Sequence, residues 1–115
     1  MKKILVSEII NSNIAVATDS GELVFDKIST LLDKNELIEL SFFGISIITT
    51  AFLNAAIGQL YSKNYESNFL NEHLKLKDIQ EEDIPLFKMV VERAKEYFSN
   101  KENFEQLSDD FFDEK

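Results

Sequence analysis

One apolar stretch, residues 36–61, constrains the fold of this 115-residue chain more than any other segment. It opens with residues 37–42, which are rich in the side chains that favour a buried strand. A connector, residues 43–48, leads to Thr49–Thr50 and then to residues 51–61, which contain three Ala, no Pro and apolar residues at helical spacing. The stretch therefore predicts a strand, a tight connector and a threonine-capped helix that starts at the rim of a sheet.

Two short strands and a helix are predicted before this stretch. Residues 4–6 are typical of a strand, and Ile9–Ile10 extend the apolar stretch before the chain turns. Residues 14–17 are typical of a second strand, a candidate hairpin partner of the first. Asp19 then predicts a helix start, because its carboxylate can accept hydrogen bonds from first-turn N–H groups and Glu22 can reach back. One face of that helix is apolar.

After residue 61 the pattern predicts a polar connection, an edge strand and a long helix. Residues 73–77 alternate polar and apolar side chains, as in a half-exposed strand near a sheet edge. Pro85 suits the first turn of a helix whose apolar residues repeat at helical spacing as far as Phe98. The order β-β-α-β-α-β-α predicts an α/β fold, with three main helices covering a mixed sheet of about four strands, in a domain spanning residues 1–100.

Residues 101–115 form an acidic, amphipathic C-terminal tail with six acidic residues and two lysines. The apolar residues of the tail are spaced as on one face of a short helix, and they are Phe104, Leu107, Phe111 and Phe112. Two interpretations stay open. The tail is either a terminal helix, solvated or docked on its own domain, or a segment that folds in the groove of a partner.

The net charge of −9 argues against binding to nucleic acid or to an anionic membrane surface, and it suits a partner with a basic face. Without Cys, the chain forms no disulfide and no thiolate site. The apolar run at the N-terminus breaks at Ser7–Glu8, short of a signal peptide, and no apolar run approaches the ~18 residues of a membrane span. We therefore expect a cytoplasmic protein.

The residue inventory disfavours catalysis. The acidic residues lie in runs at helix starts or in the tail, where solvent surrounds them, and acid–base chemistry needs carboxylates with contrasting environments. His73 is the only His and stands among charged residues. The three Gly are scattered rather than grouped in a phosphate-binding loop, and no sequence pattern matches a zinc or calcium site. We expect no enzyme, no cofactor and no metal.

Thr49–Thr50 is the remaining candidate for function. The structural interpretation is a helix cap, in which the hydroxyl accepts hydrogen bonds from first-turn N–H groups. The functional interpretation is a modification site, because a phosphate there would add about −1.5 to −2 charge and change a docking surface.

Residues 38–54 resemble the central motif of STAS domains, which occur in anti-sigma-factor antagonists and in sulfate-transporter tails. They are more similar still to small bacterial STAS-like domains of unknown function. The motif of those domains is a strand, then Asp-Phe-x-Gly and an apolar residue, then Ile-Thr-x-Ser-Phe, an apolar residue and Asn. Residues 19–22 resemble the opening of the family's first helix, and the similarity spans about residues 4 to 98.

This resemblance implies a small STAS-like sandwich and a non-enzymatic regulatory module. Such a module docks on a histidine-kinase-like ATPase of the GHKL type and is released by phosphorylation of a Ser at the start of the second helix. In the antagonists the motif is Met-Asp-Ser-Ser-Gly-Leu, and the second Ser accepts the phosphate. Ala51 stands at that position here, Thr50 at the first Ser, and Ser41 replaces the Asp that precedes Phe in the STAS-like domains.

We therefore expect a protein-interaction module whose contact surface lies at the start of the second helix. The expected contact residues are Ser46, Thr49, Thr50, Ala51 and Asn54. Thr50 is the expected phosphoacceptor and Thr49 the alternative. A sensor of a small ligand or nucleotide at the same rim is the second hypothesis, and an enzyme built around Thr49 and His73 is the third. Self-association through residues 74–77 is left open by the sequence.

Overall fold

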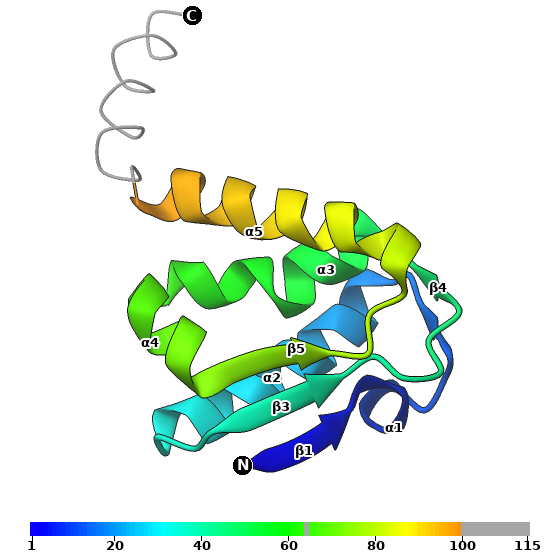
Figure 1. The fold of residues 1–115 in the computed structure, drawn as a ribbon, viewed down its shortest axis with the longest axis horizontal. Coiled ribbons are helices and arrows are strands. Elements are labelled where there is room, and N and C mark those ends of the chain that lie inside the picture. The colour runs from blue at the N-terminus through cyan, green and yellow to red at the C-terminus, as the bar shows by residue number, and fades with distance from the viewer. Residues whose placement is uncertain (64, 100–115) are drawn as a thin grey trace, which may run out of the picture.

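The computed structural model describes residues 1–63 and 65–99, and the tail prediction for residues 101–115 lies outside the described residues (Figure 1). The helices and strands follow one another as β1 (Lys2–Leu5), α1 (Val6–Ile10), β2 (Ile14–Ala15), α2 (Thr18–Asp33), β3 (Ile38–Ser41), β4 (Ile47–Ile48), α3 (Thr50–Ala56), the 3₁₀ helix η1 (Gly58–Ser62), α4 (Ser67–His73), β5 (Leu74–Lys77), the 3₁₀ helix η2 (Glu81–Asp83) and α5 (Ile84–Ser99).

The strands form two separate parallel sheets. The larger sheet has the order β1-β3-β5, and its register pairs Ile4 with Leu40 and Leu40 with Leu76. The smaller sheet pairs β2 with β4, so that Ile14 lies beside Ile47. Parallel neighbours require crossover connections, which α2 and the segment from α3 to α4 provide.

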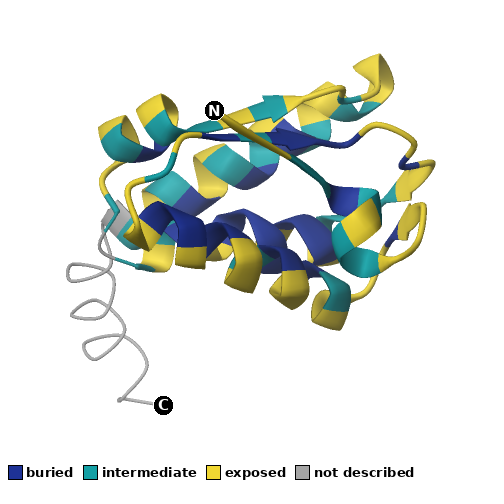
Figure 2. Cartoon of the chain, turned by 90° about the horizontal axis from the view of Figure 1, so that it is seen from below, coloured by how far each residue is buried: buried dark blue, intermediate teal, exposed yellow. Residues whose placement is uncertain are grey.

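The larger sheet has one apolar face, which the helices cover, and one charged face. Ile38 and Leu40 of the central strand are fully buried on the covered face. On the other face Lys3, Glu39 and Lys75 lie side by side, and Lys3 Nζ is 4.0 Å from Glu39 Oε2. Figure 2 shows the buried residues gathered where the helices and the sheet face one another. One side of this sheet is therefore a polar surface.

Helices α2 and α3 pack against each other very closely, at Gly21. A Cβ atom at this position would lie 2.5 Å from the Phe52 carbonyl oxygen and 2.8 Å from the Ala55 Cβ. Phe52 is itself fully buried and faces the shared core. Helix α5 forms an outer layer on α3 and η1 (Figure 1), and Phe87 at its start makes an edge-on ring contact with Phe42 at 4.8 Å. The contact at Gly21 thus sets how closely α2 and α3 approach each other.

The predicted arrangement of strands is wrong in several respects. Residues 4–6 and 14–17 do not pair as a hairpin, since β1 pairs with β3 and β2 with β4, all in parallel. The mixed sheet of about four strands is replaced by two parallel sheets of three and two strands. Ile47–Ile48, predicted as connector, form β4, because this short segment finds its partner in β2, more than thirty residues earlier.

The predicted helices also need correction. The apolar stretch that ends at Ile9–Ile10 contains helix α1, which was not predicted, and Asn11 closes that helix in a left-handed conformation (φ 54°). The polar connection after residue 61 contains α4, which ends at His73, so the edge strand begins one residue later than predicted. Asp19 lies inside the first turn of α2, not at its cap, which is Ala17. The helix predicted for residues 51–61 is α3 followed by η1.

Several predictions are confirmed. The strand expected in residues 37–42 is the central strand β3, and β5 lies at the sheet edge. The helix expected around Pro85 and Phe98 is α5. The chain is an α/β protein with a threonine-capped α3.

Candidate functional site

The start of α3 lies at the carboxyl end of the smaller sheet. This sheet end and the helix start are together called the rim. Helix α3 follows β4 with only Thr49 between them, and the Thr49 N–H donates to the Ala15 carbonyl at the end of β2 (3.1 Å). The predicted position of this helix start is therefore correct, although the strand that leads into it is β4 and not β3.

The two threonines differ in their hydrogen bonds. Thr49 is the N-cap, as predicted, and its hydroxyl accepts from the Phe52 N–H (3.3 Å) and donates to the Val16 carbonyl (2.9 Å). The Thr50 hydroxyl makes no hydrogen bond within residues 1–63 and 65–99. Both side chains are half-buried. Of the two hydroxyls, only that of Thr50 can react without giving up a structural bond.

Exposed apolar side chains flank this helix start. Ile47 is 51% exposed and lies beside Ile14, which is 41% exposed, because the two are register partners on the outer face of the smaller sheet. Val16, which follows β2, is 39% exposed. Large apolar side chains grouped on a surface are typical of an interaction site.

A groove of about 720 Å³ runs from the rim between α2 and α3. The residues that line it are Thr18, Glu22, Phe25, Asp26, Ala51, Asn54, Ala55 and Gln59. Glu22 and Asp26 are one helical turn apart on α2, and neither carboxylate forms an ion pair with the described part of the chain. No Lys or Arg is among these described lining residues. The groove is therefore acidic, with an apolar wall formed by Phe25 and the alanines.

Four of the five predicted contact residues lie in the groove or at the start of α3. Ala51 and Asn54 line the groove, whereas Thr49 and Thr50 stand at the helix start. Ser46 precedes β4, and its N–H and hydroxyl both donate to the Asn13 carbonyl, at 2.8 and 3.2 Å. Sequence reasoning missed the contribution of α2. A signal was present, since Thr18, Glu22 and Asp26 repeat at intervals of four on one helix.

Ser41, at the Asp position of the motif that residues 38–54 resemble, closes the turn after β3. Its fully buried hydroxyl donates to Asp78 Oδ2 (2.6 Å) and accepts from the Phe43 N–H (3.2 Å). Gly44 completes the turn with φ +82°, a conformation that L side chains rarely adopt. Ser41 and Asp78 therefore join the ends of β3 and β5 at the carboxyl edge of the larger sheet.

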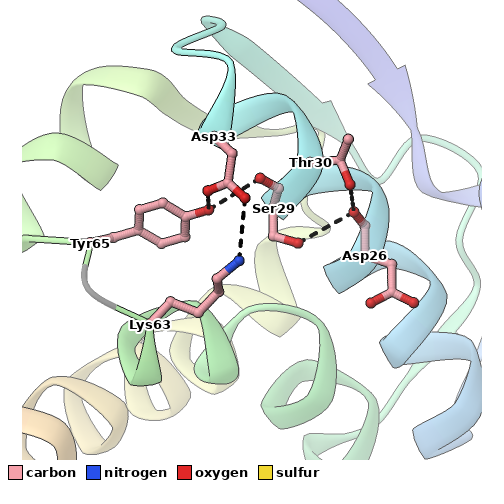
Figure 3. Close-up of polar contacts among 6 residues, drawn as sticks. All are labelled: Asp26, Ser29, Thr30, Asp33, Lys63 and Tyr65. Carbon is pink, nitrogen blue, oxygen red and sulfur yellow. Dashed lines mark hydrogen bonds and ion pairs between the residues drawn. The ribbon is translucent and has the colours of Figure 1, made fainter.

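A second polar cluster, drawn in Figure 3, ties the end of α2 to the segment after η1. The Tyr65 hydroxyl donates to the Asp33 carboxylate and lies 3.1 Å from the Ser29 carbonyl, and Lys63 Nζ is 3.5 Å from Asp33 Oδ2. The Tyr65 hydrogen bond and then Lys63 hold the pKa of Asp33 below its ordinary value, against partial desolvation. Desolvation and the Asp33 charge raise the pKa of Tyr65. These contacts join the end of α2 to the segment that follows η1.

His73 takes part in packing. Its ring stacks on Phe69 with centroids 3.9 Å apart, and its Nδ1 lies 2.9 Å from the Phe69 carbonyl oxygen. It lies before the amino end of β5, whereas Thr49 follows the carboxyl end of β4 in the other sheet. The arrangement gives His73 a structural role at the end of α4.

A family model described as a STAS-like domain of unknown function matches residues 20–83, more than half of the chain. The chain belongs to this family. No match was found among curated proteins or among solved structures. The part of the STAS-like domain that the family model covers includes most of α2 and all of β3, β4, α3 and β5.

STAS-like domains are generally non-enzymatic binding modules. None of the helices in the described residues is long and apolar enough to cross a lipid bilayer. The groove and the helix start both fall within the matched segment, except for Thr18.

Proposed function

We propose that this STAS-like domain is a non-enzymatic regulatory module that docks on a protein partner through the rim and the adjoining acidic groove. The exposed apolar group of Ile14, Val16 and Ile47 at the start of α3 is the observation that carries the proposal. Burial of such side chains stabilises a complex, at about 25 cal/mol per Å² of apolar surface removed from water. The partner that the family resemblance favours is a GHKL-type ATPase related to histidine kinases.

The charge of the groove indicates the character of the partner's surface. Glu22 and Asp26 offer two carboxylates without an ion pair in the described chain, so a Lys or Arg of the partner would find a complementary site there. The same carboxylates argue against a nucleotide sensor, the second hypothesis from the sequence. The phosphate groups of a nucleotide would meet two negative charges, and no cationic residue is among the described lining residues.

Replacement of Ile47 by Asp is expected to weaken binding to the partner at least about tenfold, because the change places a charge in the apolar centre of the interface. The test is calorimetric titration of the GHKL-type ATPase encoded nearest to this gene with the wild-type and variant chains. Leu23→Asp is the matched control, since Leu23 is 52% exposed on α2 and lies outside the groove. Equal weakening by the two variants would contradict docking at the rim.

Phosphorylation of Thr50 is expected to release the partner. In the proposed reaction the Thr50 hydroxyl oxygen attacks the γ-phosphorus of ATP bound to the partner. The bond from that phosphorus to the β–γ bridging oxygen breaks, ADP leaves, and the hydroxyl proton passes to a base on the partner. The new phosphate adds about −1.5 to −2 charge beside an apolar contact, and its desolvation opposes docking.

Mass spectrometry of the chain after incubation with the ATPase and ATP measures this reaction. We expect one phosphate on wild-type protein, none on Thr50→Ala, and one on Thr49→Ser, which keeps a hydroxyl at the cap. A phosphate found on Thr49 or on another residue would refute the assignment to Thr50, while leaving docking at the rim to be judged by the Ile47 variant.

A further inference from the structure

The outer side of β5 is an apolar hollow with no strand beside it in the described chain. β5 pairs with β3 on one side only, and a hollow of about 390 Å³ lies between β5, η1, α4 and α5. Tyr61, Leu74, Leu76 and Val91 line the hollow and are half-buried. An uncovered strand edge with apolar neighbours can pair with a strand of another chain. Natural proteins prevent this by covering such edges or by placing charged side chains on them.

Two lysines border this hollow, on the face of β5 opposite to Leu74 and Leu76. Lys75 and Lys77 line it and are exposed, and neither forms an ion pair with residues 1–63 or 65–99. Within the described residues, Lys75 Nζ donates one hydrogen bond, to the Asn71 carbonyl oxygen. The net charge of the chain is −9. Among the described residues, however, no acidic side chain lines this hollow. Its charge is therefore opposite to that of the acidic groove between α2 and α3.

We propose that the hollow beside β5 is the docking site of the chain's own C-terminal segment, residues 100–115. This segment combines four large apolar residues with six acidic ones, which complement the apolar lining and the two lysines. The distance is short, because Val91 of the lining precedes Ser99 by eight residues of helix, or about 12 Å. An extended segment of this length can span more than about 50 Å, so the chain can turn back and reach the hollow.

A second copy of the chain fits this edge less well. Pairing of two β5 strands from different copies would bring Lys75 and Lys77 of one copy against the same lysines of the other. Like charges placed opposite each other across strands are destabilising. The acidic segment instead meets these lysines with opposite charge, and it is tethered to the same molecule, which gives it a high effective concentration.

A nitroxide label on the full-length chain tests this docking. The chain has no Cys, so Ser108→Cys provides a single attachment point. In the ¹⁵N spectrum we expect the label to broaden the amide signals of Leu70, Leu74 and Lys77. Phe104→Ser with Phe111→Ser should remove most of this broadening, and so should Lys75→Glu with Lys77→Glu, because each pair deletes one side of the contact.

The controls separate docking from simple proximity. Lys27→Glu with Lys34→Glu makes the same charge change in α2 and at its C-cap, outside the hollow, and should leave the broadening intact. Broadening that survives both the tail variant and the Lys75/Lys77 variant would overturn the proposal. So would broadening in a mixture of ¹⁵N chain without label and labelled chain without ¹⁵N, since that signal would identify a second copy as the occupant.

Discussion

Replacement of Phe52 by Ala is expected to lower the free energy of unfolding by about 3–5 kcal/mol, the largest effect of any substitution considered for this domain. Phe52 is fully buried, packs in the main core, and lies in the first turn of α3 beside the cap. Removal of the ring leaves a cavity behind the rim. It also removes the favourable free energy of transferring the ring from water to the core. Urea denaturation followed by circular dichroism measures the change.

Phe43→Ala is the matched control for Phe52→Ala. Phe43 lies one residue before Gly44 in the turn after β3 and is 70% exposed. Its removal should change the free energy of unfolding by less than about 0.5 kcal/mol. If Phe52→Ala does not fold at all, Phe52→Leu should show an intermediate loss. A Phe52→Ala variant as stable as Phe43→Ala would mean that α3 is not anchored by this ring.

The second large effect is expected for Gly21→Ala, with a net loss of about 1–3 kcal/mol in the free energy of unfolding. Alanine by itself favours a helix by about 1 kcal/mol over glycine, so the helical propensity acts in the opposite direction. The added Cβ would stand 2.5 Å from the Phe52 carbonyl oxygen, and this backbone atom cannot rotate away. Helices α2 and α3 must separate, and the groove between them must change shape. The measurement is again urea denaturation.

Gly58→Ala distinguishes this effect from a general cost of replacing glycine. A Cβ at Gly58 meets its nearest neighbour, Asn54 Oδ1, at 3.5 Å, which is an ordinary contact. Gly58→Ala should therefore be neutral or slightly stabilising. If the two alanine variants have the same stability, the close approach of α2 and α3 at Gly21 does not exist in solution.

Features that depend on local sequence were predicted well. The cap at Thr49 follows from its position before a helical pattern, and the buried strand β3 follows from its dense apolar residues. The resemblance of residues 38–54 to STAS-like domains led to the correct family, which the family model shows independently over residues 20–83. These features are encoded within a few neighbouring residues, so no tertiary information is needed to read them.

Features that depend on distant partners were missed. β4 contains only two residues, and a strand of that length has no alternating pattern to detect, whereas β2 was predicted as a strand but with the wrong partner. Their pairing exists only because the chain brings Ile14 and Ile47 together. The groove depends on the same long-range packing, since Gly21 lets α2 approach α3 and so places Glu22 beside Asn54 and Ala55. Helix periodicity alone does not indicate which other helix will lie alongside.

The separation of the two sheets has a consequence for how tightly the rim is held. The β2–β4 ladder and its flanking bonds, from Ser46 to Asn13 and from Thr49 to Ala15 and Val16, connect the rim to a few backbone groups only. We expect this region to open locally at a free energy well below that of global unfolding, while the β1-β3-β5 ladder stays closed. A bound partner would then suppress this local opening. The observed binding free energy would be reduced by the free energy needed to order residues that are loosely held in the isolated domain.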